Sequence, residues 1–293
     1  MDRIAVSGAN AEFGRGVVEA LLRHRDPASI IATVRDPARA HDLGDRGVTV
    51  RPGDFDDAPT LTASFAGAAT VLINATFFGQ QPELRGARVA TAIRSAVAAG
   101  ASRLVVTTWP EADTCPLELT RDFLETERLV RTSGPNWTIL RLGYGIADSI
   151  ARDVSWALRA GRLDAPAGDA HCVPAAVPDL IDATALVLLN PDHDGRCYEL
   201  SGPRAVDWTE LAELATSIAG RPIEYHAISE DTFRTQLRDL GLPQPAATGL
   251  LAYYAAFRSG WGNQPHPDLA TLLGRPAQDT LEAIRQRVPV PAP

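Results

Sequence analysis

The chain has 293 residues, a formal net charge of −8 at pH 7, 45% hydrophobic residues and 22% charged residues, which is ordinary for a globular protein. Basic residues form no stripe along the sequence, so nucleic acid is not expected as a partner. Because no stretch approaches the roughly 18 apolar residues of a bilayer span and no signal peptide is recognisable, we expect a cytoplasmic protein without a membrane partner.

Two features of the residue content limit the chemistry. All 28 basic residues are arginine, which excludes a Schiff base, a P-loop lysine and a Tyr-x-x-x-Lys catalytic pair. The cysteines Cys115, Cys172 and Cys197 are far apart, and the six histidines show no ligand spacing. We therefore predict neither a disulfide framework nor a metal site.

The first 22 residues are expected to form a strand, a glycine turn and the start of a helix. A short alternating strand is followed by Gly8 and Gly14 and then by an apolar helical run. This layout places the pyrophosphate of a dinucleotide on a helix N-terminus. The fingerprint is incomplete, because Ala11 stands where the middle glycine belongs and Glu12 puts a carboxylate in a phosphate-facing turn.

Strands and helices then alternate through the first half of the chain. This alternation predicts an α/β fold with a doubly wound parallel sheet, helices on both of its faces and right-handed crossovers. The further strands are predicted at residues 29–34, 48–51, 70–74, 103–108 and 137–142, and the helices between them at 36–43, 57–65, 83–99 and 119–132.

The regular alternation ends after Gly145. We expect residues 1–145 to form a dinucleotide-binding core, joined by residues 179–203, and residues 146–178 and 204–293 to form a smaller substrate-side lobe. Helices are predicted there at 149–159, 179–189, 208–219, 230–240, 268–273 and 279–287, with a last strand at 197–200.

Ligands of doubly wound sheets bind at the carboxyl ends of the strands, so the residues there are the first candidates. Arg35 ends the second strand, where an arginine favours the 2′-phosphate of NADP(H) over NAD(H). The alternative is a solvated arginine, and the adjacent Asp36 leaves room for NAD(H). Asp54 can accept a hydrogen bond from an adenine amino group, with Phe55 stacking nearby, or it can cap the following helix.

Two hydroxyl groups are candidates for polarising a substrate carbonyl that accepts hydride. Thr108 ends the fifth strand and Tyr144 follows the sixth. The structural alternatives are a hydrogen bond to the backbone for Thr108 and an aromatic pocket wall for Tyr144.

The predicted substrate pocket is mostly aromatic. It also includes His171, for which the alternative to a pocket role is packing within its loop. The apolar cluster at residues 250–257 with Trp261 is interpreted as core or pocket lining, with a homodimer patch as the remaining alternative. The predicted pocket residues are Trp109, Tyr144, Trp156, His171 and Tyr253.

Seven segments spread over nearly the whole chain carry a family resemblance through their order and spacing. They are Gly8–Arg15, Val34–Pro37, Gly53–Phe55, Ala98–Arg103, Glu127–Arg141, Tyr198–Pro203 and Gly274–Pro276. Together they resemble the NmrA-like group of atypical short-chain dehydrogenases, close to its NADPH-dependent quinone reductases.

The resemblance implies a Rossmann fold with a small C-terminal lobe and NADP(H) as cofactor, with NAD(H) less favoured. This sequence departs from the family pattern at Ala11, at Thr108 in place of a serine, and at Phe123 in place of a lysine or histidine. The implied cofactor contacts are Gly8, Asn10, Ala11, Glu12, Phe13, Gly14 and Arg35, with Asp54 and Phe55 near the adenine and Ala75, Thr76 and Phe77 near the nicotinamide-side ribose.

These observations favour an NADPH-dependent reductase that transfers hydride to a quinone or other conjugated carbonyl, with a secondary-metabolite intermediate as one option. Two alternatives stay open. Phe123 removes an obvious proton donor, as expected of a regulatory protein that senses NADP(H) without turnover. Ala11 and Glu12 suit a cofactor-independent isomerase, cyclase or hydrolase that reuses the same cleft.

Overall fold

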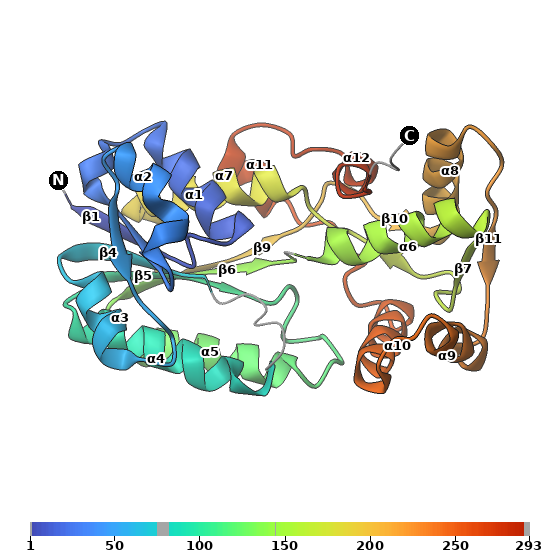
Figure 1. The fold of residues 1–293 in the computed structure, drawn as a ribbon, viewed down its shortest axis with the longest axis horizontal. Helices are drawn as coiled ribbons and strands as arrows, with labels where there is room; N and C mark the ends of the chain where they lie inside the picture. The colour runs from blue at the N-terminus through green and yellow to red at the C-terminus, as the bar shows by residue number, and fades with distance from the viewer. Residues whose placement is uncertain (1, 75–81, 144, 290–293) are drawn as a thin grey trace.

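Seven parallel strands form the central sheet of the computed structural model, which describes residues 2–74, 82–143 and 145–289. The strand order is β3-β2-β1-β4-β5-β6-β9, and every neighbouring pair runs parallel (Figure 1). This is the doubly wound order expected of a Rossmann fold, extended by one strand. The strands are β1 (Arg3–Ser7), β2 (Ile30–Val34), β3 (Thr49–Pro52), β4 (Ala68–Ile73), β5 (Arg103–Thr108), β6 (Asn136–Leu142) and β9 (Arg196–Leu200).

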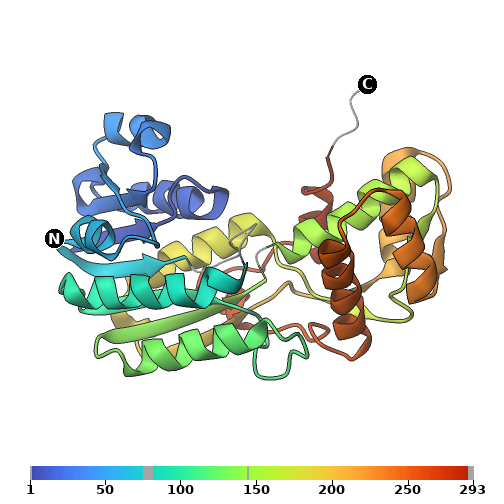
Figure 2. The same ribbon diagram turned by 60° about the horizontal axis from the view of Figure 1, so that its bottom comes forward.

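Helices cover both faces of this sheet, so its central strands are buried on both sides. All residues of β2 and β5 are buried, which explains their continuous apolar and threonine-rich sequences. Figures 1 and 2 show the two helical layers with the sheet between them. One layer contains α1 (Glu12–Leu22), α7 (Val177–Leu189) and α11 (Asp268–Leu273), and the other contains α3 (Ala58–Phe65), α4 (Arg85–Ala98) and α5 (Thr120–Thr132). The short α2 (His41–Asp45) precedes β3.

A second group of elements lies beyond the carboxyl edge of the sheet (Figure 1). It begins with α6 (Ile146–Ala160), which follows β6 and packs against α8. Its largest fully buried side chain is Trp208. Its other elements are the parallel pair β7 (Leu163–Ala165) and β11 (Tyr225–Ala227), the antiparallel pair β8 (His171–Cys172) and β10 (Val206–Asp207), α8 (Trp208–Ala219), α9 (Glu230–Asp239), α10 (Gln244–Arg258) and α12 (Thr280–Arg285).

The structure differs from the sequence expectation mainly in this second half. The segment expected to be loop-rich, 161–178, contains β7 and β8, whose partners lie far along the chain. Such two- and three-residue strands have no periodicity of their own, because only the distant partner makes them strands. Helix α6 begins three residues before its predicted start, with Gly145 at its N-cap at φ +93°. No helix in the described ranges is long and apolar enough to cross a bilayer.

Candidate functional site

The glycine turn between β1 and α1 requires glycine at its two ends. Gly8 has φ +70°, a conformation that L-residues with a side chain rarely adopt. A Cβ atom on Gly14 would lie 2.5 Å from the carbonyl oxygen of Gly8, which is too close for any real contact. Ala11, where a middle glycine was expected, has an ordinary extended backbone (φ −89°, ψ 154°), so alanine causes no strain there. The turn is therefore intact despite the missing glycine.

The N-terminus of α1 has no side-chain cap. Ala11 is the N-cap residue, and it offers no acceptor to the first backbone N–H groups of the helix. Asn10 donates from Nδ2 to the carbonyl of Asp36 at 2.9 Å, while its buried Oδ1 has no hydrogen-bond partner in the described structure. The positive end of a helix without a side-chain cap and the unpaired buried oxygen of Asn10 fit a polyanionic ligand with donor groups, as a dinucleotide is.

The residues after β2 include the arginine that the sequence predicts to bind the 2′-phosphate of NADP(H). Arg35 is exposed and makes no hydrogen bond or ion pair within the part of the chain that the structure describes. The carboxylate of Asp36 accepts from the backbone N–H of Ala38 at 3.1 Å and caps the short helix Pro37–Ala40. The guanidinium is thus available to a 2′-phosphate. The carboxylate of Asp36, which could otherwise bind a ribose hydroxyl, already caps the short helix.

The residues after β3 form a turn next to this site. Gly53 donates its N–H to the carbonyl of Val34, which ties the end of β3 to the end of β2. Asp54 accepts from the backbone N–H of Asp56 at 3.1 Å, and Asp57, not Asp54, caps α3. Phe55 is half-buried against the hydrophobic core between the sheet and helices α3 and α4. The proposed contacts of Asp54 and Phe55 with adenine stay predictions.

Three polar residues that sequence reasoning missed lie under the glycine turn. The backbone N–H of Asn74 donates to Ser7 Oγ at 2.9 Å, and Thr107 Oγ1 donates to Asn74 Oδ1 at 3.4 Å. Asn74 Nδ2 lies 3.5 Å from the position of a Cβ on Gly8. All three are buried at the carboxyl ends of β1, β4 and β5. Their signal was a polar side chain at the end of an otherwise apolar strand.

Thr108 faces a buried ion cluster on the α5 side of the sheet. Its hydroxyl donates to Glu127 Oε1 at 3.0 Å, and it is 3% exposed. Arg141 donates to the same carboxylate from Nε at 2.7 Å and to Glu199 at 3.0 Å. Burial raises the pKa of Glu199. A hydrogen bond from Thr108 to a substrate would have to replace its bond to Glu127, and the catalytic role of Thr108 stays a prediction.

Four aromatic side chains, Trp109, Phe123, Tyr253 and Trp261, form an aromatic wall at the carboxyl end of β5. Trp109 stacks on Trp261 with ring centroids 5.9 Å apart and also contacts Tyr253 at 6.0 Å and Phe123 at 5.3 Å. The guanidinium of Arg85 lies 3.4 Å above the Phe123 ring. Phe123 therefore supports this group of aromatic side chains at the position where the family pattern has a lysine or histidine. Burial raises the pKa of Tyr253.

The predicted substrate residues divide into separate places. Trp109 and Tyr253 lie together at the end of β5. Trp156 instead contacts Phe233 and lines a cavity of about 550 Å³ between α6 and α9, and the exposed His171 pairs with Asp207 in the β8–β10 ribbon. The cluster around residues 250–257 is largely buried inside the second group of elements, as core lining requires.

Four predicted site residues, Ala75, Thr76, Phe77 and Tyr144, lie outside the described residues. Within the described ranges, no group of three or more histidine, cysteine, aspartate or glutamate residues has a geometry that could hold a metal ion.

The parallel sheet, the uncapped helix after a glycine turn and the adjacent free arginine define a dinucleotide-binding α/β protein. A family model described as NAD(P)H-binding matches residues 8–158. The chain belongs to this family, which confirms the predicted fold class and the NAD(P)H cofactor.

Comparison with individual proteins extends the similarity to the whole chain. Quinone oxidoreductase 2 of Escherichia coli is 32% identical over 283 residues, covering 96% of this chain and 97% of that protein. The crystal structure of the E. coli NADPH-dependent quinone oxidoreductase QOR2 with NADPH has a TM-score of 0.89 at 31% identity and covers 97% of this chain and 99% of that one. The Citrobacter triphenylmethane reductase with NADP(H) has a TM-score of 0.86 at 26% identity and covers 97% and 99%. These similarities support a reductase and do not favour the regulatory or cofactor-independent alternatives.

Proposed function

We propose that the protein is an NADPH-dependent reductase that delivers hydride to a quinone or another conjugated carbonyl compound. The observation that carries the proposal is the exposed guanidinium of Arg35, which makes no hydrogen bond or ion pair in the described structure, beside an uncapped α1 and next to an Asp36 already engaged in capping. The similar quinone reductase and triphenylmethane reductase support an extended aromatic acceptor.

The proposed roles of the chain's residues follow from their positions. The uncapped N-terminus of α1 binds pyrophosphate and Arg35 binds the 2′-phosphate. The bound nicotinamide supplies the hydride. The wall formed by Trp109 and Tyr253 holds a flat acceptor by stacking and excludes water from it.

We also propose that residues 146–178 and 204–293 act as the substrate-side lobe, because Tyr253 and Trp261 reach the end of β5 from that part of the chain. Helix α11, from the same part, packs against α7 and β9 of the main sheet. The three cysteines are free thiols, which supports a reducing compartment such as the cytoplasm. A homodimer is the assembly we would test first, by light scattering.

The cofactor assignment is tested by Arg35→Ala. Loss of a charge-assisted bidentate contact is expected to weaken NADPH binding by about tenfold or more while NADH binding changes little. The measurement is an equilibrium fluorescence titration with each dinucleotide, followed by NADPH oxidation with a panel of quinones. Arg94→Ala, at an exposed arginine of α4, is the control. An equal loss for both dinucleotides would refute the role of Arg35, and binding without any turnover would refute the reductase.

A further inference from the structure

An arginine near the C-terminus joins the glycine turn to the second group of elements. Arg287 donates from Nη1 to Glu12 Oε1 at 2.6 Å and from Nη2 to Glu12 Oε2 at 3.0 Å. Its Nε donates to Asp148, in the first turn of α6. One guanidinium thus bridges the first residue of α1, the start of α6 and the segment after α12.

The position of Arg287 is set by the buried residues on either side of it. Ile284 and Val288 are 0% and 7% exposed and belong to the core of the second group of elements. The backbone N–H of Arg287 also donates to the carbonyl of Ile284 at 2.9 Å. The hydrogen bond to Glu12, followed in size by the one to Asp148, raises the pKa of the Arg287 guanidinium. The side chain therefore carries its positive charge at every working pH. Arg287 is therefore a fixed cation opposite the turn.

Glu12 places a negative charge at the predicted phosphate site, and the guanidinium of Arg287 compensates that charge. Glu12 is the first residue of α1, where the helix dipole attracts its carboxylate to the same place as a ligand phosphate. An unpaired carboxylate there would repel the pyrophosphate of a dinucleotide bound at the same helix end. In the structure both carboxylate oxygens are instead bound by Arg287, which is itself held toward α6 by Asp148.

We propose that Arg287 is a positioning residue for the cofactor, which neutralises Glu12 and holds its carboxylate away from the N-terminus of α1. The inference rests on the proposed function, since it concerns binding of the same dinucleotide. It accounts for a glutamate in a phosphate-facing turn, and it assigns a role in the cofactor site to a residue 275 positions from Glu12 along the chain.

A double-mutant cycle tests the proposal through NADPH binding by the full chain, measured by fluorescence titration without a substrate. Arg287→Gln should raise the Kd for NADPH about 2- to 5-fold, the typical range for one charge at a helix end. Glu12→Gln should lower the Kd, because it removes the carboxylate that repels the pyrophosphate. The double variant Glu12→Gln/Arg287→Gln should return to within about twofold of the wild type, because the two effects are coupled. The increase caused by Arg287→Gln should shrink at high salt.

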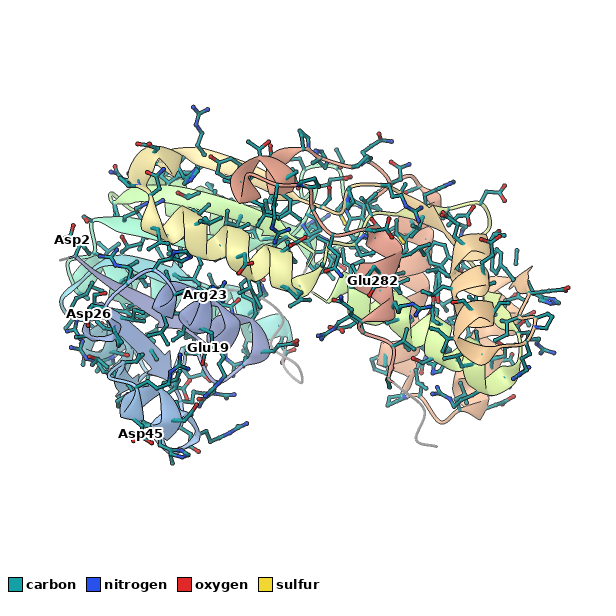
Figure 3. All side chains as sticks on the ribbon, turned by 90° about the horizontal axis from the view of Figure 1, so that it is seen from above. Asp2, Glu19, Arg23, Asp26, Asp45 and Glu282 are labelled. Atoms are coloured by element: carbon teal, nitrogen blue, oxygen red, sulfur yellow. The ribbon has the colours of Figure 1, made fainter. Side chains whose placement is uncertain are left out.

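A second ion pair, whose glutamate lies on the same helix, provides the control. Arg46 donates to both carboxylate oxygens of Glu19 on α1 at 2.7 Å, and Glu19, labelled in Figure 3, follows Glu12 by seven positions along the chain. Arg46→Gln should not alter the Kd. The Tm of each ligand-free variant shows whether Arg287→Gln acts only by lowering the stability of the folded protein.

The outcomes separate three cases. An unchanged Kd for Arg287→Gln overturns the proposal. So does an equal loss in the wild-type and Glu12→Gln backgrounds, since Arg287 would then act independently of Glu12. A wild-type protein that binds neither dinucleotide overturns the proposed function together with this inference.

Discussion

Gly14→Ala is the sharpest test of the glycine turn, because the clash it creates involves only backbone atoms. The added methyl would lie 2.5 Å from the carbonyl oxygen of Gly8, 2.8 Å from its carbonyl carbon and 3.0 Å from the carbonyl oxygen of Ser7. No side chain can rotate away, so α1 must move from β1. Overpacking of this kind costs about 1–3 kcal/mol, partly offset by up to about 1 kcal/mol from the better helix propensity of alanine.

A glycine elsewhere in the chain isolates the propensity effect. Gly249 lies inside α10, and a Cβ there would meet nothing within 4 Å. Gly249→Ala should therefore stabilise the protein by about 0.4–1 kcal/mol. By contrast, Gly14→Ala should lower the Tm by up to about 5 °C and weaken NADPH binding, since the turn proposed to hold the phosphate moves. Calorimetry and the NADPH titration measure both effects. A Gly14→Ala protein as stable as Gly249→Ala, with unchanged Kd, would refute the close-contact reasoning.

Two further predictions concern the substrate side. Thr108→Val removes the hydroxyl that the sequence predicts to polarise a substrate carbonyl, so kcat with a quinone should fall, whereas Thr108→Ser should retain it. Lower thermal stability with unchanged kcat would instead assign this hydroxyl to Glu127 alone. Tyr253→Ala removes part of the aromatic wall and should raise the KM for a quinone without changing the Kd for NADPH, with Trp156→Phe, at the α6–α9 cavity, as the comparison. Equal KM values for the two variants would contradict the placement of the acceptor at the end of β5.

Much of the dinucleotide site could be predicted because it depends on local pattern. Gly8 and Gly14 are demanded by a positive φ and a close backbone approach within one turn. Arg35 follows a strand whose buried run is visible in the sequence. Strand ends and turns are encoded by neighbouring residues, and parallel order brings the ends of β1, β2 and β3 to one edge.

Partner choice by individual side chains could not be predicted in the same way. Thr108 and Thr107 are adjacent threonines at the end of one strand, yet they hydrogen-bond to Glu127 and Asn74, which come from different elements. Alternation predicts that they face opposite sides of the sheet, but not which side holds a carboxylate. The side that holds the carboxylate is decided by the packing of α5, which carries Glu127.

The sequence by itself determined the order of the main-sheet strands and of the helices between them, the glycine turn and the arginine at the end of β2, because periodicity and turn chemistry act over a few residues. Only the tertiary structure decided what surrounds them. It paired β7 with β11, placed Trp109 against Trp261, and brought Arg287 to Glu12. Those contacts join residues far apart in the chain, so they exist only once the elements pack and a charged or aromatic side chain meets the one partner within reach.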